Sequence, residues 1–260
     1  MPNLLQFDPA QFVGFFLIFS RISGVMISAP ILGDSNIPPF IKVLLTFIIS
    51  LVFYPVVAAP NLGANPGTAQ LLLTTLSEVG IGLLMGYTVR LMFTGIGLAG
   101  EVIGFQMGIG MANIFDPTSQ TQTSLVGQIQ TIFALLLFIT LDGHLLFIRS
   151  LAGSYQIIQA GGLVMTEGAT KFYTAQLGQI FLVGMQLGAP LIVSLMVANL
   201  GMGLITRAVP QLNVIIVGIP FTIALGLIFL SAGFPFFIHA LILMNEKLES
   251  LLMMALRVMR

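Results

Sequence analysis

The chain has 260 residues, of which 57% are hydrophobic and only 7% are charged, and its mean hydropathy is +1.06. Soluble domains carry about 25% charged residues, so this chain has too little charge to cover a water-facing surface and is expected in a membrane or in a larger apolar assembly. The formal net charge of zero excludes the basic field that attracts nucleic acid, and the absence of Cys excludes disulfides, thiolate metal sites and a cysteine nucleophile.

The N-terminal half begins with two candidate membrane helices. Asp8 stands where a signal peptide would carry Lys or Arg, so the first apolar segment is expected to stay in the mature protein. A membrane helix needs about 20 mostly apolar residues. The first candidate, 11–29, is interrupted by Arg21, and the second, 40–59, follows a Gly- and Pro-containing turn at 33–39.

The next apolar segment, 70–110, is too long for one membrane crossing. It is either two helices with a break near Thr94-Gly95 or one long helix that leaves the lipid. The glycines at 100, 104 and 108 would share one helical face, which predicts close packing against another helix.

The following part of the chain also predicts helices. Segment 125–149 is a further span whose end is weakened at Asp142, and 150–171 is expected to be a surface connection. Segments 172–206 and 208–245 lack Asp, Glu, Lys and Arg and predict a helical hairpin. Strand-type alternation is not evident, so the expected fold class is all-α.

Two prolines and the C-terminal tail add detail to this hairpin. Pro190 and Pro220 lie near the interiors of its two helices and are expected to kink them. The tail, 245–260, places its charged residues on one side and its leucines on another, which indicates an amphipathic helix for an interface or a partner.

One run, 104–122, is neither plain membrane helix nor plain polar loop. Glycines give its backbone freedom, two methionines are deformable, and Asp-Pro ends any helix before an uncharged polar tract. An irregular segment at membrane depth must be buried in protein or line a water-filled passage. These physical features leave a channel plug and an ordinary loop outside the membrane as open alternatives.

Ionisable residues inside apolar segments are costly in lipid and mark either a pathway or a pair. Here they are expected to pair between helices or between subunits, with a conduction role as the alternative. Motifs for paired-acid, nucleophile-elbow or phosphate-loop chemistry are not evident, so we expect no catalytic site, no cofactor and no metal site.

Several motifs resemble the flagellar biosynthetic protein FliR family. They are the GFQMG motif at 104–108, the tetrapeptide IFDP at 114–117, and the run 135–155. Residues 175–245 also resemble FliQ, a small two-helix partner. The resemblance implies a FliP-like part, 1–171, with a plug loop within 104–123, fused to a FliQ-like hairpin with an amphipathic C-terminal helix, 172–260.

The resemblance also implies function and partners. One copy of such a chain closes a helical ring of FliP and FliQ subunits, the export gate of the flagellar type III secretion system in the bacterial inner membrane. FlhB and FlhA are the further partners implied, together with membrane lipid and unfolded export substrates. A virulence injectisome subunit, a small-molecule transporter and a membrane-embedded enzyme are the alternatives.

The expected functional residues form two groups. The plug or gate group is Gln106, Met107, Gly108, Gly110, Met111, Ile114, Phe115, Asp116 and Pro117. The charges expected at subunit contacts are Arg21, Glu78, Arg90, Glu101, Asp142 and Arg207.

Overall fold

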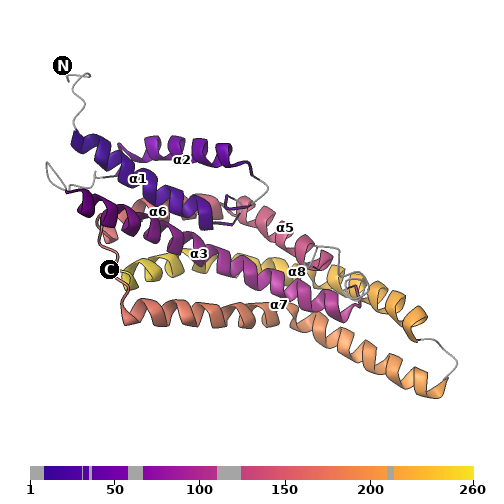
Figure 1. Ribbon diagram of the computed structural model, residues 1–260. Coiled ribbons are helices and arrows are strands. Elements are labelled where there is room, and N and C mark those ends of the chain that lie inside the picture. Colours follow the sequence, from indigo (N-terminus) through magenta and orange to yellow (C-terminus); the bar gives the residue numbers. More distant parts are fainter. Residues whose placement is uncertain (1–8, 31, 35–36, 58–66, 110–123, 210–213) are drawn as a thin grey trace. The chain divides into compact units, whose positions relative to one another are not determined.

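The computed structural model describes residues 9–30, 32–34, 37–57, 67–109, 124–209 and 214–260, and the regular structure in these ranges is entirely helical. The all-α fold class is therefore confirmed (Figure 1). The helices are α1 (Pro9–Ser28), α2 (Pro39–Phe53), α3 (Thr68–Gln106), α5 (Leu125–Thr140), α6 (Gly143–Ile157), α7 (Glu167–Ala208) and α8 (Val214–Val258).

Within the described part of the chain, α1, α3, α7 and α8 are long and apolar enough to cross a membrane. Counting the broken pair α5 and α6 as one span gives up to 5 crossings. This agrees with the apolar composition, because helices are the segments that satisfy all their backbone hydrogen bonds internally in lipid.

The chain divides into two compact units that do not follow chain order. The first unit comprises 1–91, 142–176 and 247–260, and the second comprises 92–141 and 177–246. Helices α3, α7 and α8 therefore each contribute one part to each unit. The division into a FliP-like part, 1–171, and a FliQ-like hairpin, 172–260, stays a prediction.

In the first unit, glycines bring the backbones of α1 and α3 together. A Cβ at Gly82 would meet the carbonyl oxygen of Arg21 and would lie 2.9 Å from the amide nitrogen of Val25. A Cβ at Gly24, on the other helix, would lie 2.9 Å from the amide nitrogen of Leu83. Only glycine allows such a crossing, because any side chain here would collide with backbone.

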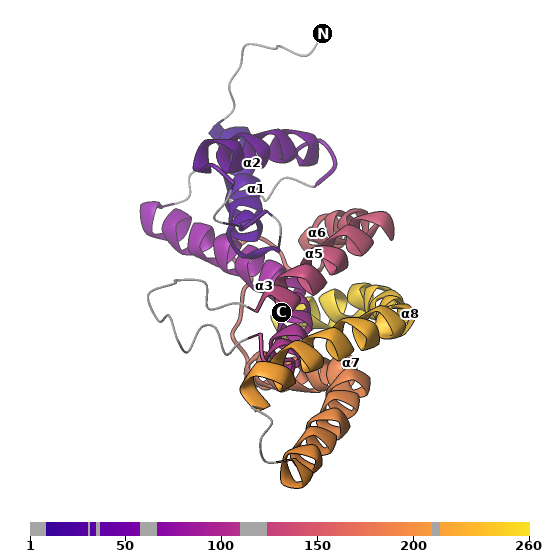
Figure 2. The ribbon, with the colours of Figure 1, turned by 90° about the vertical axis from the view of Figure 1, so that its right-hand side faces the viewer.

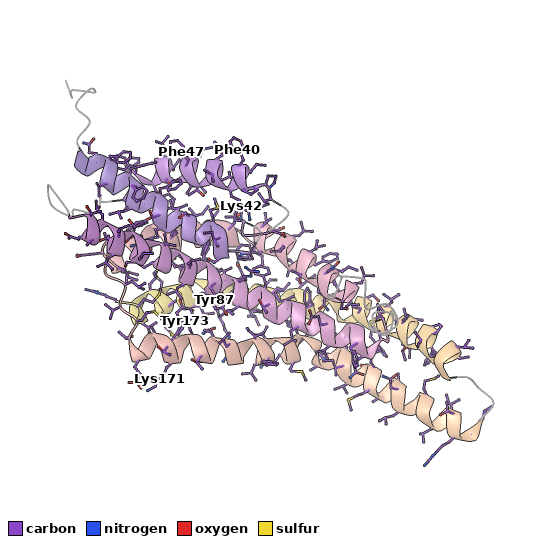
Figure 3. The ribbon with its side chains drawn as sticks, viewed as in Figure 1. Phe40, Lys42, Phe47, Tyr87, Lys171 and Tyr173 are labelled. Atoms are coloured by element: carbon purple, nitrogen blue, oxygen red, sulfur yellow. The ribbon has the colours of Figure 1, made fainter. Side chains whose placement is uncertain are left out.

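Helix α2 lies beside α1 in both ribbon views (Figures 1 and 2). Thr46 and Ser50 are buried, and each hydroxyl donates to a carbonyl of its own helix. Phe40, labelled in Figure 3, is 75% exposed. A helix with polar residues inside and apolar residues outside needs an apolar surrounding, either lipid or another protein.

In the second unit, α3 packs closely on α7 and on α5. A Cβ at Gly184 would lie 3.1 Å from the carbonyl oxygen of Gly95. Farther along α3, a Cβ at Gly100 would lie 2.7 Å from the amide nitrogen of Gly127. These contacts confirm that Gly100 serves helix packing, as its spacing predicted. Gly108 does not share that helical face, because α3 ends at Gln106 and Gly108 has a φ of 83°.

The contacts of Gly95 also bear on the question that the sequence left open for 70–110. This segment is one continuous helix of 39 residues from Thr68 to Gln106, about 58 Å long at 1.5 Å per residue. Gly95 does not break α3, because it provides the close approach to α7 at that point.

Two sequence expectations were wrong in detail. Segment 125–149 is not one continuous helix, because Asp142 has a φ of 56° and separates α5 from α6, which are bent by 67°. Segment 150–171 is not all connection, because α6 continues to Ile157 and α7 begins at Glu167. The tail 245–260 is helical and amphipathic as predicted, with Leu248 and Leu252 buried and Glu249 exposed, and it forms the last part of α8, which runs without interruption to Val258. Both α7 and α8 continue through their internal prolines.

We expect Gly82→Ala to destabilise the protein by about 1–3 kcal/mol, because the clash of the added methyl group can be relieved only by separating the backbones of α1 and α3. The midpoint of thermal unfolding in detergent measures this. Gly178→Ala is the matched control, since it lies in α7 with no atom within 4 Å of an added Cβ. Equal midpoints for the two variants would contradict the close crossing.

Candidate functional site

The run that the sequence singled out begins where α3 ends, and the helix end is capped by backbone geometry. Gly108 has a φ of 83°, a conformation that favours glycine. Its amide donates to the carbonyl of Phe105 at 3.0 Å, and the amide of Ile109 donates to the carbonyl of Gly104 at 3.1 Å. This pair of bonds is a Schellman motif, the common way to end a helix at a glycine.

Met107, next to this cap, is fully buried in the core of the second unit. Its side chain lies in a cluster with residues of α5 and α7, and Ile109 packs against the same cluster. The buried members of that cluster are Ile103, Met107, Val126, Leu191, Ile192 and Leu195. Met107 is therefore an anchor at the end of α3.

Helix α8 contacts Met107 at two positions one turn apart. The hydroxyl of Thr222 donates to the carbonyl oxygen of Met107 at 2.9 Å. A Cβ at Gly226 would lie 2.7 Å from the sulfur of Met107 and 2.6 Å from its terminal methyl. We call the contact of Met107 with Thr222 and Gly226 the Met107 socket.

Ser124, which follows this run, also lies against α3. Ser124 precedes α5, and its hydroxyl is buried without a hydrogen-bond partner among the described residues. A Cβ at Gly104 would meet that hydroxyl. Gly104 therefore brings the beginning of α5 close to the last turns of α3. Residue 109 follows the packed end of α3, and residue 124 precedes the packed beginning of α5.

The structure places only some of the expected gate residues. Met107 and Gly108 form the anchor and the cap, while the half-buried side chain of Gln106 accepts a hydrogen bond of 3.5 Å from the amide of Asn199. The remaining members of the group lie outside the described residues: Gly110, Met111, Ile114, Phe115, Asp116 and Pro117.

In the first unit, two of the charged residues predicted from the sequence meet each other. The guanidinium of Arg21 on α1 and the carboxylate of Glu78 on α3 form two parallel hydrogen bonds, of 2.7 Å and 3.0 Å. Both side chains are 0% exposed. The pairing is thus between helices of one chain, which is the interhelical alternative, and neither side chain reaches the surface.

A set of polar partners completes the surroundings of this ion pair. The guanidinium also donates to the hydroxyl of Ser154 at 2.9 Å and to the carbonyl of Ile158 at 3.2 Å, and it lies 4.0 Å from the centre of the Tyr155 ring. The amide of Gly161 donates to Glu78 at 3.4 Å. Because a buried charge is stabilised only by such partners, α1, α3, α6 and the connection after α6 are joined at one point.

The other four predicted charges lie on the surface of their own units. Arg90, Glu101, Asp142 and Arg207 are all exposed, and Asp142 marks the break between α5 and α6. Their expected role at subunit contacts stays a prediction.

The sequence reasoning missed Thr222, Gly226, Ser154 and Tyr155. A Thr and a Gly four residues apart in an apolar helix are also found in ordinary helix packing, so the pattern alone did not single them out. The cap at Gly108 carried a signal, because Gly followed by an apolar residue is typical of a Schellman end.

Removing one partner of the buried ion pair should leave the other charge uncompensated. We expect Arg21→Met or Glu78→Leu to destabilise the protein by about 3–5 kcal/mol each, and the double variant to lose less than the sum of the two. Thermal unfolding in detergent of the natural protein, the two single variants and the double variant completes a double-mutant cycle. Glu167→Gln is the control. The side chains of Glu167 and Lys171 are 82% and 76% exposed, so their ion pair should contribute little to stability. Additive losses would show that the two side chains do not depend on each other.

Comparison with known proteins assigns the sequence to a family. Residues 12–247 match the model of bacterial export proteins, family 1. The flagellar biosynthetic protein FliR of Escherichia coli (strain K12) is 32% identical over 221 residues, which cover 85% of this chain and 84% of the relative. FliR of Bacillus subtilis (strain 168) is 30% identical over 234 residues, which cover 88% of each chain. FliR of Caulobacter vibrioides is 31% identical over 216 residues, which cover 83% and 86% of the two chains. The chain therefore belongs to bacterial export protein family 1, the family of the flagellar FliR proteins.

Proposed function

We propose that this chain is a non-enzymatic subunit of the core export gate of the flagellar type III secretion system. In this role the loop of the run 104–123 closes a protein-conducting passage until a substrate arrives. Membership of the FliR family makes the chain a component of a flagellar export apparatus. The observation that carries the finer proposal is that α3 ends in a capped and buried anchor, Met107–Gly108, directly where the Gly- and Met-rich run leaves the helix.

An anchored beginning matters for a plug. A loop that blocks a passage must be positioned by rigid elements, because otherwise conformational entropy would favour the many open arrangements. The Schellman cap and the Met107 socket fix the first residues of the run, and the packing of Ser124 on Gly104 fixes the beginning of α5.

The outer surface of the second unit supports an assembly with other chains. In the most apolar window of α8 only 11% of the residues are buried within the chain. Large apolar side chains such as Leu200 and Leu204 of α7 are each 67% exposed. FliP- and FliQ-like subunits would cover these faces, with lipid around the assembly and FlhB and FlhA beside it in the inner membrane at the flagellar basal body.

The scarcity of charge in the second unit fits the same arrangement. Its 120 residues include only four Asp, Glu, Lys or Arg: Glu101, Asp116, Arg207 and Glu246. A surface with so few charges could not remain exposed to water. Unfolded substrate would pass through a channel made jointly with the other subunits, and the energy for transport would come from other components.

Deleting 110–122, which retains the anchor at Met107, should make the inner membrane permeable to small solutes while the gate still assembles. Uptake of a small dye or ion by cells, measured at equal amounts of assembled complex, reports the leak. The triple replacement Met111→Ser, Ile114→Ser and Phe115→Ser should leak in the same direction, because it removes the bulky apolar side chains of the loop.

A matched control for these variants is Gln120→Ser with Gln122→Ser, which changes residues of the same loop without altering its apolar part. Cells with this control variant should take up no more dye than cells with the natural protein. If the deletion variant assembles normally and the membrane stays impermeable, the plug role is wrong.

A further inference from the structure

Helix α8 contributes the hydroxyl of Thr222 as a donor to the carbonyl of Met107, for which α3 itself offers no amide donor. The last carbonyl groups of a helix have no amide donor within the helix. The Schellman motif serves the carbonyls of Gly104 and Phe105, and the hydroxyl of Thr222 serves that of Met107.

The same hydroxyl also lies within hydrogen-bond distance of two carbonyls of its own helix, those of Gly218 at 3.1 Å and Ile219 at 3.0 Å. In a regular helix, these two carbonyls accept from the amides of residues 222 and 223. The carbonyl of Met107 is therefore the acceptor that most depends on the hydroxyl proton, and Thr222 is buried.

Packing at the second position restricts the same residue. Gly226 leaves room for the side chain of Met107 on the surface of α8, because any Cβ there would overlap its sulfur and neighbouring carbons. A Cβ at Gly108 would lie 3.6 Å from a methyl group of Ile219, so the capping glycine also packs against α8. Hydrogen bond and packing together define one position of the end of α3 along α8.

We infer that Thr222 and Gly226 are positioning residues for the gate: they set where the run after Gly108 begins by fixing Met107 on α8. The inference rests on the proposed plug function for its physiological meaning. The structural part, that Thr222 fixes the end of α3, stands on the contacts of the Met107 socket alone. No residue of the socket touches a transported chain in this account, and Thr222 acts through Met107.

The test uses the assembled complex and the absence of native Cys in this chain. Ile109→Cys gives a single thiol one residue beyond the cap, at a half-buried position. Thr222→Val removes the hydroxyl at nearly constant volume, and we expect the thiol to react about five- to tenfold faster with a water-soluble maleimide, because the loss of one buried hydrogen bond favours opening by that factor. The dye leak should rise with it.

Thr222→Ser retains the hydroxyl and should restore slow labelling and a tight membrane, which a general loss of core packing would not do. Thr140→Val is the matched control, because its exposed hydroxyl bonds only within α5. If Thr222→Val prevents assembly, Gly226→Ala provides the second variant, and it should also speed labelling by displacing the side chain of Met107.

The two proposals fail separately. Labelling at residue 109 that is unchanged by both Thr222→Val and Gly226→Ala overturns the positioning role, whatever the dye shows. Faster labelling without any dye leak supports the positioning role of the Met107 socket. If the variant lacking 110–122 also leaves the membrane impermeable, the plug function is wrong.

Discussion

Much of the structure follows from one constraint: buried charges and buried hydroxyl groups depend on partners inside the chain, because its outer faces are apolar. The ion pair of Arg21 and Glu78 is the strongest case, because neither charge is exposed. Arg21 donates a hydrogen bond to Ser154 of α6, and Glu78 accepts one from the amide of Gly161 in the connection that follows α6. Helix α2 follows the same rule with Thr46 and Ser50. A fold built in this way is complete only within lipid or among other apolar chains.

Close backbone contacts make the internal partners reachable. Glycines bring α1 against α3 in the first unit, and α3 against α5 and α7 in the second. In the second unit this packing leaves α3 with a fixed end, and α8 supplies the hydroxyl and the space that Met107 requires. A loop that leaves such an end starts from a defined point, which is what a plug requires of the chain that carries it.

The sequence predicted the helical class and most spans well, because long apolar segments with little charge allow few other structures. It could not decide whether Thr94-Gly95 breaks α3, since a glycine reads alike as a helix breaker and as a packing contact. It placed a weak point at Asp142 without showing that this residue separates two helices. The pairing of Arg21 with Glu78 was beyond local patterns, because the two residues are 57 positions apart. Met107 was predicted as a gate residue from the Gly- and Met-rich composition of the run 104–122 and from the family resemblance. The structure shows its side chain buried at the end of α3, where it anchors that run.

The proposed function requires this chain to work only as one part of a joint channel. The most direct measurement is native mass spectrometry after tagging this chain and extracting it in mild detergent from bacteria that express the whole export apparatus. We expect one stable complex with FliP- and FliQ-like chains, and loss of those chains when the exposed Leu200 and Leu204 of α7 are both replaced by Gln. A chain that emerges alone and monodisperse, and that moves a solute across vesicles without other subunits, would contradict it.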